Sequence, residues 1–317
     1  MVAILGVSGQ TASPRNRVDE AITLSAPDGA PLACRVAHGE PAFPALLLIH
    51  GMGSNMTRWS EFVHHTSLRP RFEIVRPDLR GHGDSIRRAT LSMEVWCADL
   101  AAVLAARGQR HALVVGHSLG AVVALWLALL YPARVRGLVL VEPSFSAAMA
   151  GMTPSLRRLR WLFTAAARTV LALNRLGIHR RRLPGRDLWE WDRRARRDLL
   201  DAGRREDLVR LYRSVWVDLR YNATSAYLQD FVQLLRPLPP LDRIRAPSLT
   251  LLSSETSFAD RQTTEAILSL LPDNRIETLP ATHWIMTETP EAAREHIDRW
   301  CSAMSDLSKA ATEPARP

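Results

Sequence analysis

Short, continuous apolar segments alternate with segments of helical period along most of this chain. The predicted strands cover residues 45–51, 72–79, 111–118, 137–143, 247–255 and 274–280. The predicted helices cover residues 93–108, 119–131, about 260–271 and 291–304. Strands that read as unbroken apolar runs are buried on both faces, which is typical of a mainly parallel sheet covered by helices on each side. The alternation therefore predicts an α/β fold.

The alternation is interrupted once, between residues 144 and 240. This stretch is helical and rich in arginine, and it contains no strong strand pattern. Upstream, the sequence around Asp28 and Gly29 predicts a β-hairpin. We therefore divide the chain into a core of residues 18–143 and 241–304, a helical insertion of residues 144–240, and flexible termini at residues 1–17 and 305–317.

Charge and cysteine content narrow the class of protein. The formal net charge is +9, and almost all of the 41 basic residues are arginines, many of them between Arg157 and Arg220. Acidic residues are interleaved from Asp187 to Asp207, and no nucleic-acid-binding motif accompanies the charge, so we expect a solvated helical face and no nucleic-acid partner. The three cysteines are far apart in the sequence, which predicts reduced structural thiols.

No segment has the pattern of a membrane helix or of a secretory signal. No uninterrupted apolar run reaches the ~18 residues that a membrane span needs. The apolar segment at the N-terminus lacks the basic flank and the cleavage site of a signal peptide. We therefore expect a cytoplasmic protein.

Polar residues gather where the predicted strands end. In a parallel sheet these ends share one edge, and ligands bind beyond it. The residues at this edge are His50, Asp78, Ser118, Glu142 and Glu255, with His283 just after the last strand. Ser118 is flanked by Gly116 and Gly120, which predicts a sharp strand-to-helix turn with the serine at its apex.

Four motifs in order resemble the α/β-hydrolase family over residues 20–304. They are HGMG after the third strand, DLRGHGDS at 78–85, GHSLG at 116–120 and ATHWIMTETP at 281–290. The resemblance implies a mainly parallel eight-stranded sheet flanked by helices, with residues 144–240 as an inserted helical cap. It also implies that His50, His82 and Asp78 have structural roles, and that His117 is a packing residue.

The same resemblance assigns chemical roles to four positions. Ser118 would be the nucleophile, and it needs a base within hydrogen-bond reach because a serine hydroxyl is a poor nucleophile at neutral pH. His283 would be that base, followed by an aromatic residue, Trp284, as is common in the family. The backbone N–H groups of Met52 and Leu119 would form the oxyanion hole.

The third member of the triad is less clear from the sequence. The family's usual G-x-x-D pattern after the seventh strand is replaced here by LLSSETSFAD. We favour Glu255, because its interval to His283 is close to the usual one. Glu142, at the end of the sixth strand, is the alternative acid, and Asp260 is expected to begin the following helix.

A serine nucleophile disfavours epoxide and haloalkane hydrolysis, since both need a carboxylate nucleophile. We expect a carboxylic-ester hydrolase that acts on an ester, thioester or lactone of an apolar acyl group, with C6–C8 chains preferred to acetyl. The alternatives are carbon–carbon hydrolysis of β-diketone-like substrates, or a hydrolase-fold protein that binds a ligand with little turnover. Neither a Cys/His cluster nor a glycine-rich phosphate loop is present, so we predict no metal and no organic cofactor.

The first part of the cap, residues 155–182, is amphipathic and basic. Two interpretations remain open for it. It could contact an anionic membrane as a peripheral helix, or it could pack its apolar stripe on the main domain. We favour packing.

Overall fold

The computed structural model describes residues 19–149, 160–255 and 259–312. Its strands are β1 (Glu20–Ser25), β2 (Pro31–Ala37), β3 (Ala45–Ile49), β4 (Ile74–Pro77), β5 (Ala112–His117), β6 (Val135–Val141), β7 (Ser248–Ser253) and β8 (Asn274–Leu279). They form one eight-stranded sheet in the order β1-β2-β4-β3-β5-β6-β7-β8. The β1–β2 and β2–β4 pairs are antiparallel and the other pairs are parallel, which confirms the predicted fold.

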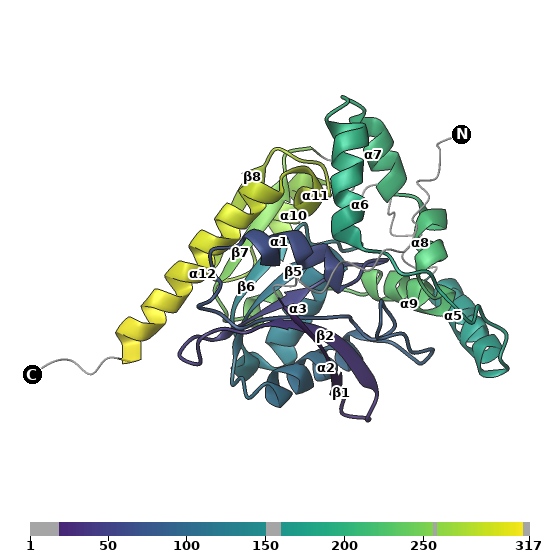
Figure 1. Cartoon of the computed structure of the whole chain (residues 1–317), viewed down its shortest axis with the longest axis horizontal. Coiled ribbons are helices and arrows are strands. Elements are labelled where there is room, and N and C mark those ends of the chain that lie inside the picture. The colour runs from purple at the N-terminus through teal and green to yellow at the C-terminus, as the bar shows by residue number, and fades with distance from the viewer. Residues whose placement is uncertain (1–18, 150–159, 256–258, 313–317) are drawn as a thin grey trace, which may run out of the picture.

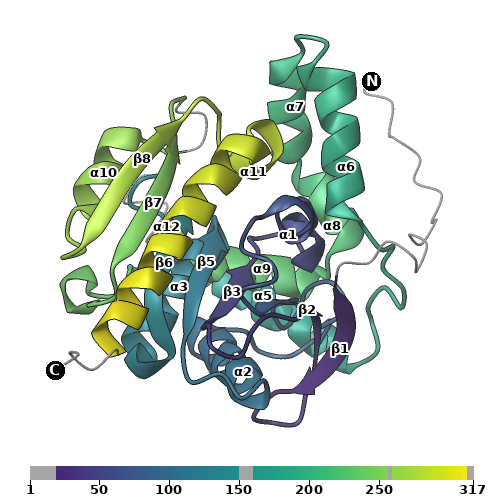
Figure 2. The same ribbon diagram turned by 60° about the vertical axis from the view of Figure 1, so that its left-hand side comes forward.

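Helices cover both faces of the sheet (Figures 1 and 2). Those of the core are α1 (Ser60–His65), α2 (Met93–Ala106), α3 (Leu119–Leu130), α10 (Arg261–Leu268), α11 (Ile285–Glu288) and α12 (Pro290–Thr312). Successive residues of one strand enter different apolar clusters: Leu47 packs with α2 and α3, whereas Leu46 packs with α1 and α12. This two-sided burial is the physical reason for the unbroken apolar runs in the sequence.

The described part of the insertion at residues 144–240, which we call the cap, contains helices and no strand. Its helices are α5 (Arg160–Arg175), α6 (Leu188–Ala195), η4 (Arg196–Leu200), α7 (Arg205–Tyr212), α8 (Val215–Tyr221) and α9 (Thr224–Leu234). In Figure 1, α6 and α7 rise above the sheet, while α5 and α9 lie together at the right. Short helical turns elsewhere are η2 (Met56–Trp59), η3 (Pro132–Arg134) and η5 (Leu241–Arg243).

The predicted flexible termini, residues 1–17 and 305–317, fall only partly on described residues. The closing helix α12 continues to Thr312, well past the predicted end at Met304, so the predicted irregular C-terminal segment begins too early. Residues 1–18 and 313–317 lie outside the described residues.

All three cysteines, Cys34, Cys97 and Cys301, are buried and unpaired, as predicted.

Candidate active site

Ser118 occupies the apex of the turn between β5 and α3. Its backbone is left-handed, with φ 55°. The flanking glycines are required by close backbone contacts. A Cβ atom on Gly116 would lie 2.3 Å from the carbonyl oxygen of Gly120, and one on Gly120 would lie 2.4 Å from that of Ile49. The predicted sharp turn is therefore present, and its sequence is dictated by sterics.

His283 lies in the loop after β8 and faces Ser118. Its Nε2 atom is 3.2 Å from Ser118 Oγ, and its Nδ1 atom is 3.1 Å from a carboxylate oxygen of Glu142. All three side chains are largely buried from solvent. The structure thus brings together a hydroxyl, an imidazole and a carboxylate in hydrogen-bonded series, which is the arrangement that activates a serine.

The carboxylate beside His283 is Glu142, and the preference for Glu255 is not met by the geometry. The Glu255 carboxylate is half exposed and lies 2.5 Å from Arg205 of α7. Glu142 is buried, and its second oxygen accepts a hydrogen bond from the backbone N–H of Ser253. Asp260, which was expected to begin the helix after β7, caps the N-terminus of α10.

The interval along the chain misled this choice because it does not state which way the Glu255 side chain turns. The β6 strand is the immediate neighbour of β5, which carries Ser118 at its end, whereas β7 is one strand further away. Adjacent strands are about 4.8 Å apart, so an acid after β7 must reach across that extra distance. Glu255 follows the end of β7 by two residues, and its side chain turns to the cap instead.

A second serine touches Ser118. Ser144 Oγ is 3.1 Å from Ser118 Oγ, and the Ser144 side chain is fully buried. A neutral imidazole whose Nδ1–H faces Glu142 offers Nε2 as an acceptor, so the single hydroxyl hydrogen of Ser118 points to His283. Ser144 is then the donor to Ser118 Oγ. Sequence reasoning missed Ser144, although its place two residues after Glu142 at the same strand end could have indicated it.

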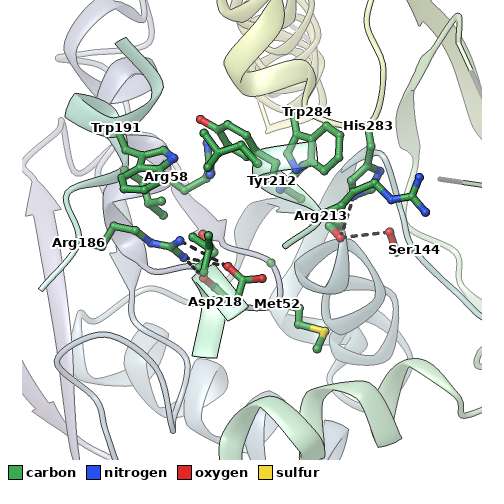
Figure 3. Close-up of a pocket in the computed structure, with 18 of the residues that line it drawn as sticks. Met52, Arg58, Ser144, Arg186, Trp191, Tyr212, Arg213, Asp218, His283 and Trp284 are labelled. Carbon is green, nitrogen blue, oxygen red and sulfur yellow. Dashed lines mark hydrogen bonds and ion pairs between the residues drawn. The ribbon is translucent and has the colours of Figure 1, made fainter. Parts of the chain in front are cut away.

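The pocket above Ser118 lies between the sheet edge and the cap (Figure 3). Its volume is about 140 Å³. Apolar lining residues are Met52, Leu188, Trp191, Leu211, Val217, Leu234 and Trp284. In Figure 3, Arg186 and Asp218 face each other on one side of the pocket, and Ser144 and His283 lie on the other. Burial raises the pKa of Asp218 to about 6, while Arg186, 3.3 Å away, opposes that shift.

Buried polar contacts tie the cap to the histidine loop. Arg58, from η2, pairs with Asp192 of α6 and donates a 3.0 Å hydrogen bond to Thr287. Glu288 accepts a 3.0 Å hydrogen bond from the backbone N–H of Thr282, next to His283, and lies 3.3 Å from Arg205. These contacts join segments far apart in the sequence, and nothing in the sequence pattern identified them.

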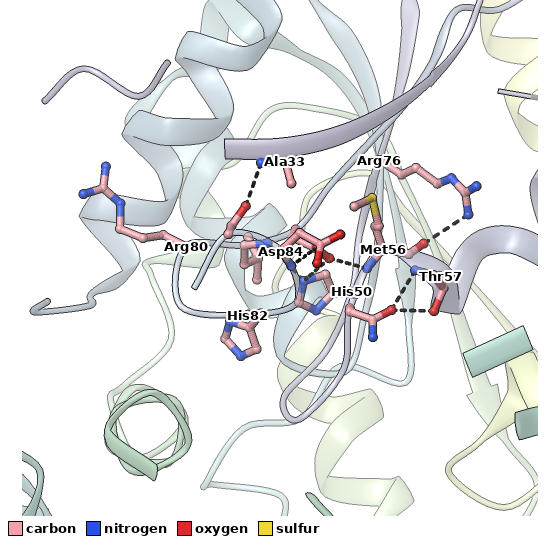
Figure 4. A network of polar contacts seen from close by, with 12 residues as sticks. Ala33, His50, Met56, Thr57, Arg76, Arg80, His82 and Asp84 are labelled. Carbon is pink, nitrogen blue, oxygen red and sulfur yellow. Dashed lines mark hydrogen bonds and ion pairs between the residues drawn. The ribbon is translucent and has the colours of Figure 1, made fainter. Parts of the chain in front are cut away.

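A separate network of polar side chains lies beneath the loops (Figure 4). His50 donates through Nδ1 to the carbonyl of Gly51 (2.9 Å) and accepts the N–H of Leu79 at Nε2 (3.0 Å). Asp78 accepts the N–H groups of Met56 and Asp84. His82 pairs with Asp230 of α9 at 2.8 Å. These contacts agree with the structural roles expected for His50, His82 and Asp78.

The remaining predicted positions also lie near Ser118. Leu119 is the first residue of α3, and amide hydrogens in the first turn of a helix have no partner within that helix. Met52 lines the pocket, and a Cβ atom on the preceding Gly51 would lie 3.1 Å from Ser118 Cβ. The buried ring of His117 has its centroid 5.6 Å from that of His283.

The described residues contain neither a metal-binding cluster nor a membrane-spanning helix. Within the parts of the chain that the structure describes, no group of three or more His, Cys, Asp or Glu side chains could hold a metal ion. Among the same residues, no helix is both long enough and apolar enough to cross a membrane.

Comparisons with known proteins identify the family of this chain. The alpha/beta hydrolase fold family matches residues 44–290. The sn-1-specific diacylglycerol lipase ABHD11 of Mus musculus is 25% identical over 263 residues, which are 82% of each chain. Lipase LipV of Mycobacterium tuberculosis (strain ATCC 25618 / H37Rv) is 39% identical over 105 residues, 33% of this chain and 39% of LipV. The chain spans only 29% of the length of the uncharacterized Mycobacterium proteins that it matches at 40% identity.

Solved structures agree in fold. A hydrolase from Pseudomonas aeruginosa PA01 has a TM-score of 0.62 at 24% identity and covers 87% of this chain and 96% of its own. The enol-lactonase from Burkholderia xenovorans LB400 has a TM-score of 0.65 at 17% identity, over 89% of this chain and 100% of its own. At these identities the likeness establishes the fold alone. Since the family pattern spans most of the chain, this protein belongs to the α/β-hydrolase fold family, among relatives of the esterase and lipase type.

Proposed function

We propose that this protein is a serine hydrolase that cleaves esters, thioesters or lactones through an acyl-enzyme on Ser118, with Glu142 as the triad acid. The hydrogen-bonded series Ser118–His283–Glu142, at 3.2 and 3.1 Å, carries the proposal. Both ends of the series have left-handed backbone, with φ 55° at Ser118 and 48° at Glu142. In the described part of the chain they are the only non-glycine residues with positive φ. Such conformations cost about 1–3 kcal/mol each and cluster at functional sites.

The proposed reaction follows from the orientation of the three groups. Ser118 Oγ attacks the carbonyl carbon while its proton moves to His283 Nε2, and Glu142 stabilises the imidazolium that forms. His283 then transfers this proton to the leaving alcohol or thiol, which leaves the acyl group on Ser118. Water, activated by His283 in the same way, releases the acid and restores the serine.

The backbone around Ser118 supports an oxyanion hole. We assign the two donors to the N–H groups of Leu119 and Met52. Leu119 begins α3, so its N–H is at the positive end of the helix dipole. The loop of Met52 runs directly against Ser118, as the close approach of Gly51 indicates. Donors aimed at a developing oxyanion are commonly the largest single contribution to such catalysis.

The size of the pocket supports a short acyl group. An apolar cavity of about 150 Å³ accommodates a benzene molecule, and this pocket measures about 140 Å³. An acyl chain of about six carbons therefore matches the available space, at the lower end of the C6–C8 range expected from the sequence. Arg58, Arg186 and Asp218 line the same pocket, and the pairs Arg58–Asp192 and Arg186–Asp218 each bring opposite charges together.

The alternatives have less support. A ligand-binding protein with little turnover was suggested only by the missing acid after β7, and the carboxylate of Glu142 beside His283 argues against it. No contact in the described site favours a β-diketone over an ester.

The test combines active-site labelling with an ester panel. A fluorophosphonate probe should label the wild-type protein and not Ser118→Ala, and equal labelling of both would refute the proposal. Thermal melts of the two proteins control for folding. With p-nitrophenyl esters from C2 to C12, kcat/KM should rise by up to about fourfold per methylene, from about 0.8 kcal/mol each, and fall beyond C8. A flat profile would show that the pocket does not select acyl length.

A further inference from the structure

The outward face of α5 is apolar and exposed. Trp161, Leu162, Leu173 and Leu176 are 64%, 44%, 39% and 76% exposed, respectively. Leu176 directly follows the last residue of α5, and its N–H still bonds to the carbonyl of Ala172. At 3.6 residues per turn the four positions therefore fall within an arc of about 120° on one side of the helix. The other residues on this arc, Ala165, Thr169 and Ala172, carry no charge. We name the four large residues the α5 stripe.

The α5 stripe is not needed for packing of the helix. The opposite side of α5 buries Ala167 and Leu171. On that side the ring of Phe163 contacts Phe231 of α9, with 4.9 Å between centroids. The helix therefore packs against the cap helix α9, one apolar face being covered and the other left in solvent. The prediction that the apolar stripe packs on the main domain does not account for this second face.

Arginines near the α5 stripe lack the ion pairs that the arginines of α6 and α7 form with described carboxylates. Around the α6–α7 hairpin, arginines pair with nearby carboxylates: Arg193 and Arg194 with Glu190, Arg197 with Asp198, and Arg204 and Arg210 with Asp207. Arg168 and Arg175 follow one edge of the α5 stripe, and Arg181 and Arg182 follow the helix. None of these four forms an ion pair with a described residue, and all are exposed.

We propose that the α5 stripe docks on an anionic phospholipid surface. A helix with exposed Trp and Leu on one side and cations along its edge inserts its apolar face at the headgroup boundary, while the cations bind anionic lipids. A second copy of this chain fits less well, because a two-fold contact would bring the same unpaired arginines against each other. The inference concerns binding, so it does not depend on the proposed catalytic function.

The test is co-sedimentation of the full-length protein with vesicles at about 0.15 M salt. One set of vesicles is phosphatidylcholine, and the other contains phosphatidylcholine with 30% phosphatidylglycerol. The wild type should bind the anionic vesicles, and Leu176→Glu should bind at least tenfold less. Leu270→Glu is the matched control, because Leu270 is 60% exposed but lies after α10. Equal loss in both variants, or no binding by the wild type, would overturn the proposal.

A second pair of variants tests the charge. The triple variant Arg168→Gln, Arg175→Gln, Arg181→Gln should bind about 100-fold more weakly, at roughly fivefold per arginine. The triple variant Arg193→Gln, Arg197→Gln, Arg210→Gln changes the net charge equally but removes paired arginines, and it should lose less than tenfold. Sedimentation velocity without vesicles tests whether a second copy of the chain occupies the stripe. If the wild type is a dimer and Leu176→Glu is a monomer, the stripe is a self-association surface and the membrane proposal is wrong.

Discussion

Two buried, hydrogen-bonded histidine–carboxylate pairs in the described part of the chain, His82–Asp230 and His283–Glu142, differ in what the second ring nitrogen of the histidine contacts. His82 and Asp230 are 2.8 Å apart and completely enclosed between the core and α9. His283 and Glu142 are 3.1 Å apart, at the wall of the pocket. The ring of His82 packs against His50 and Trp96, whereas the second nitrogen of His283 meets Ser118. The shorter, more deeply buried pair therefore holds the fold together, and the looser pair is the one placed for chemistry.

The two environments also treat charge differently. Burial lowers the pKa of His82, but the negative charge of Asp230 raises it by more. The pKa of His82 is therefore raised. Burial, and then the neighbouring His82, lower the pKa of the adjacent His50 to about 3. A histidine–carboxylate contact thus says little about catalysis until the partner of the second ring nitrogen is known.

The largest expected effect separates the pairs by activity. Glu142→Gln should lower kcat by up to about 10⁴-fold, because the acid orients the imidazole and stabilises its charged form. Steady-state kinetics on the best ester of the panel measure the effect, with thermal melts to confirm folding. A loss below tenfold would mean that Glu142 is not the orienting acid.

The converse change should separate the pairs by stability. Asp230→Asn removes the charge partner of an enclosed histidine and should cost about 3 kcal/mol, since breaking a buried pair is strongly destabilising. The Tm should fall by roughly 6–12 °C, while kcat per folded molecule stays within a few fold. A large drop in kcat at unchanged Tm would erase the distinction drawn between the two pairs.

The neutral His50 predicts acid sensitivity of the fold. Its folded pKa, about 3, lies below the unfolded value of 6.5. The unfolded chain therefore binds the extra proton first, and stability is lost as pH falls from about 6.5 toward 3. The contribution of this one group is about 1.4 kcal/mol per pH unit in that window. Urea unfolding at pH 6.5, 5.5 and 4.5 should show a shallower dependence in His50→Asn than in wild type. Equal slopes would contradict a neutral buried His50, and His38→Asn, at an exposed position, is the control.

A smaller effect is expected for the Ser144 hydroxyl, which lies beside Ser118. Ser144→Ala should lower kcat/KM about 3–10-fold, in line with the net worth of one hydrogen bond. Ser146→Ala is the matched control, because Ser146 is also buried on this segment but does not line the pocket. If both serine variants lose activity equally, the loss reflects packing of the segment and not the contact with Ser118.

The smallest effect should come from the carboxylate that the sequence favoured. Glu255→Gln breaks a half-exposed ion pair with Arg205, and such pairs contribute about 0–1 kcal/mol. We expect kcat within twofold of wild type and a Tm change of no more than a few degrees. If kcat falls by orders of magnitude in this variant while Glu142→Gln stays near wild type, then Glu255, after β7, is the orienting acid.

The sequence predicted the sheet well because each signal was local. Continuous apolar runs such as Ala45–Ile49 report burial on two faces, and Gly116 and Gly120 report a turn that tolerates no side chain. Ser118 and His283 follow from such local patterns and from motif order. The resemblance alone therefore indicates both ends of the Ser118–His283 contact.

The acid could not be predicted with the same rule, because it depends on which of the strand-end carboxylates turns toward His283. An interval in residues does not state which strand lies beside β5, nor whether Glu255 turns toward His283 or toward Arg205. The Arg58–Asp192 contact could not be predicted for a related reason. It joins residues 134 positions apart, and neither residue belongs to a periodic pattern. Side-chain direction and long-range pairing are products of packing.

The left-handed backbone at Ser118 and Glu142 has a consequence for heat-resistance screens. Glycine and asparagine adopt this conformation more readily than serine or glutamate. A mutant library selected only for survival on heating would therefore tend to accumulate Ser118→Gly or Glu142→Asn, each removing a group from the site. Thermostable variants of this protein should be sought with a turnover screen in every round, because the positions easiest to relax are the ones that the proposed reaction needs.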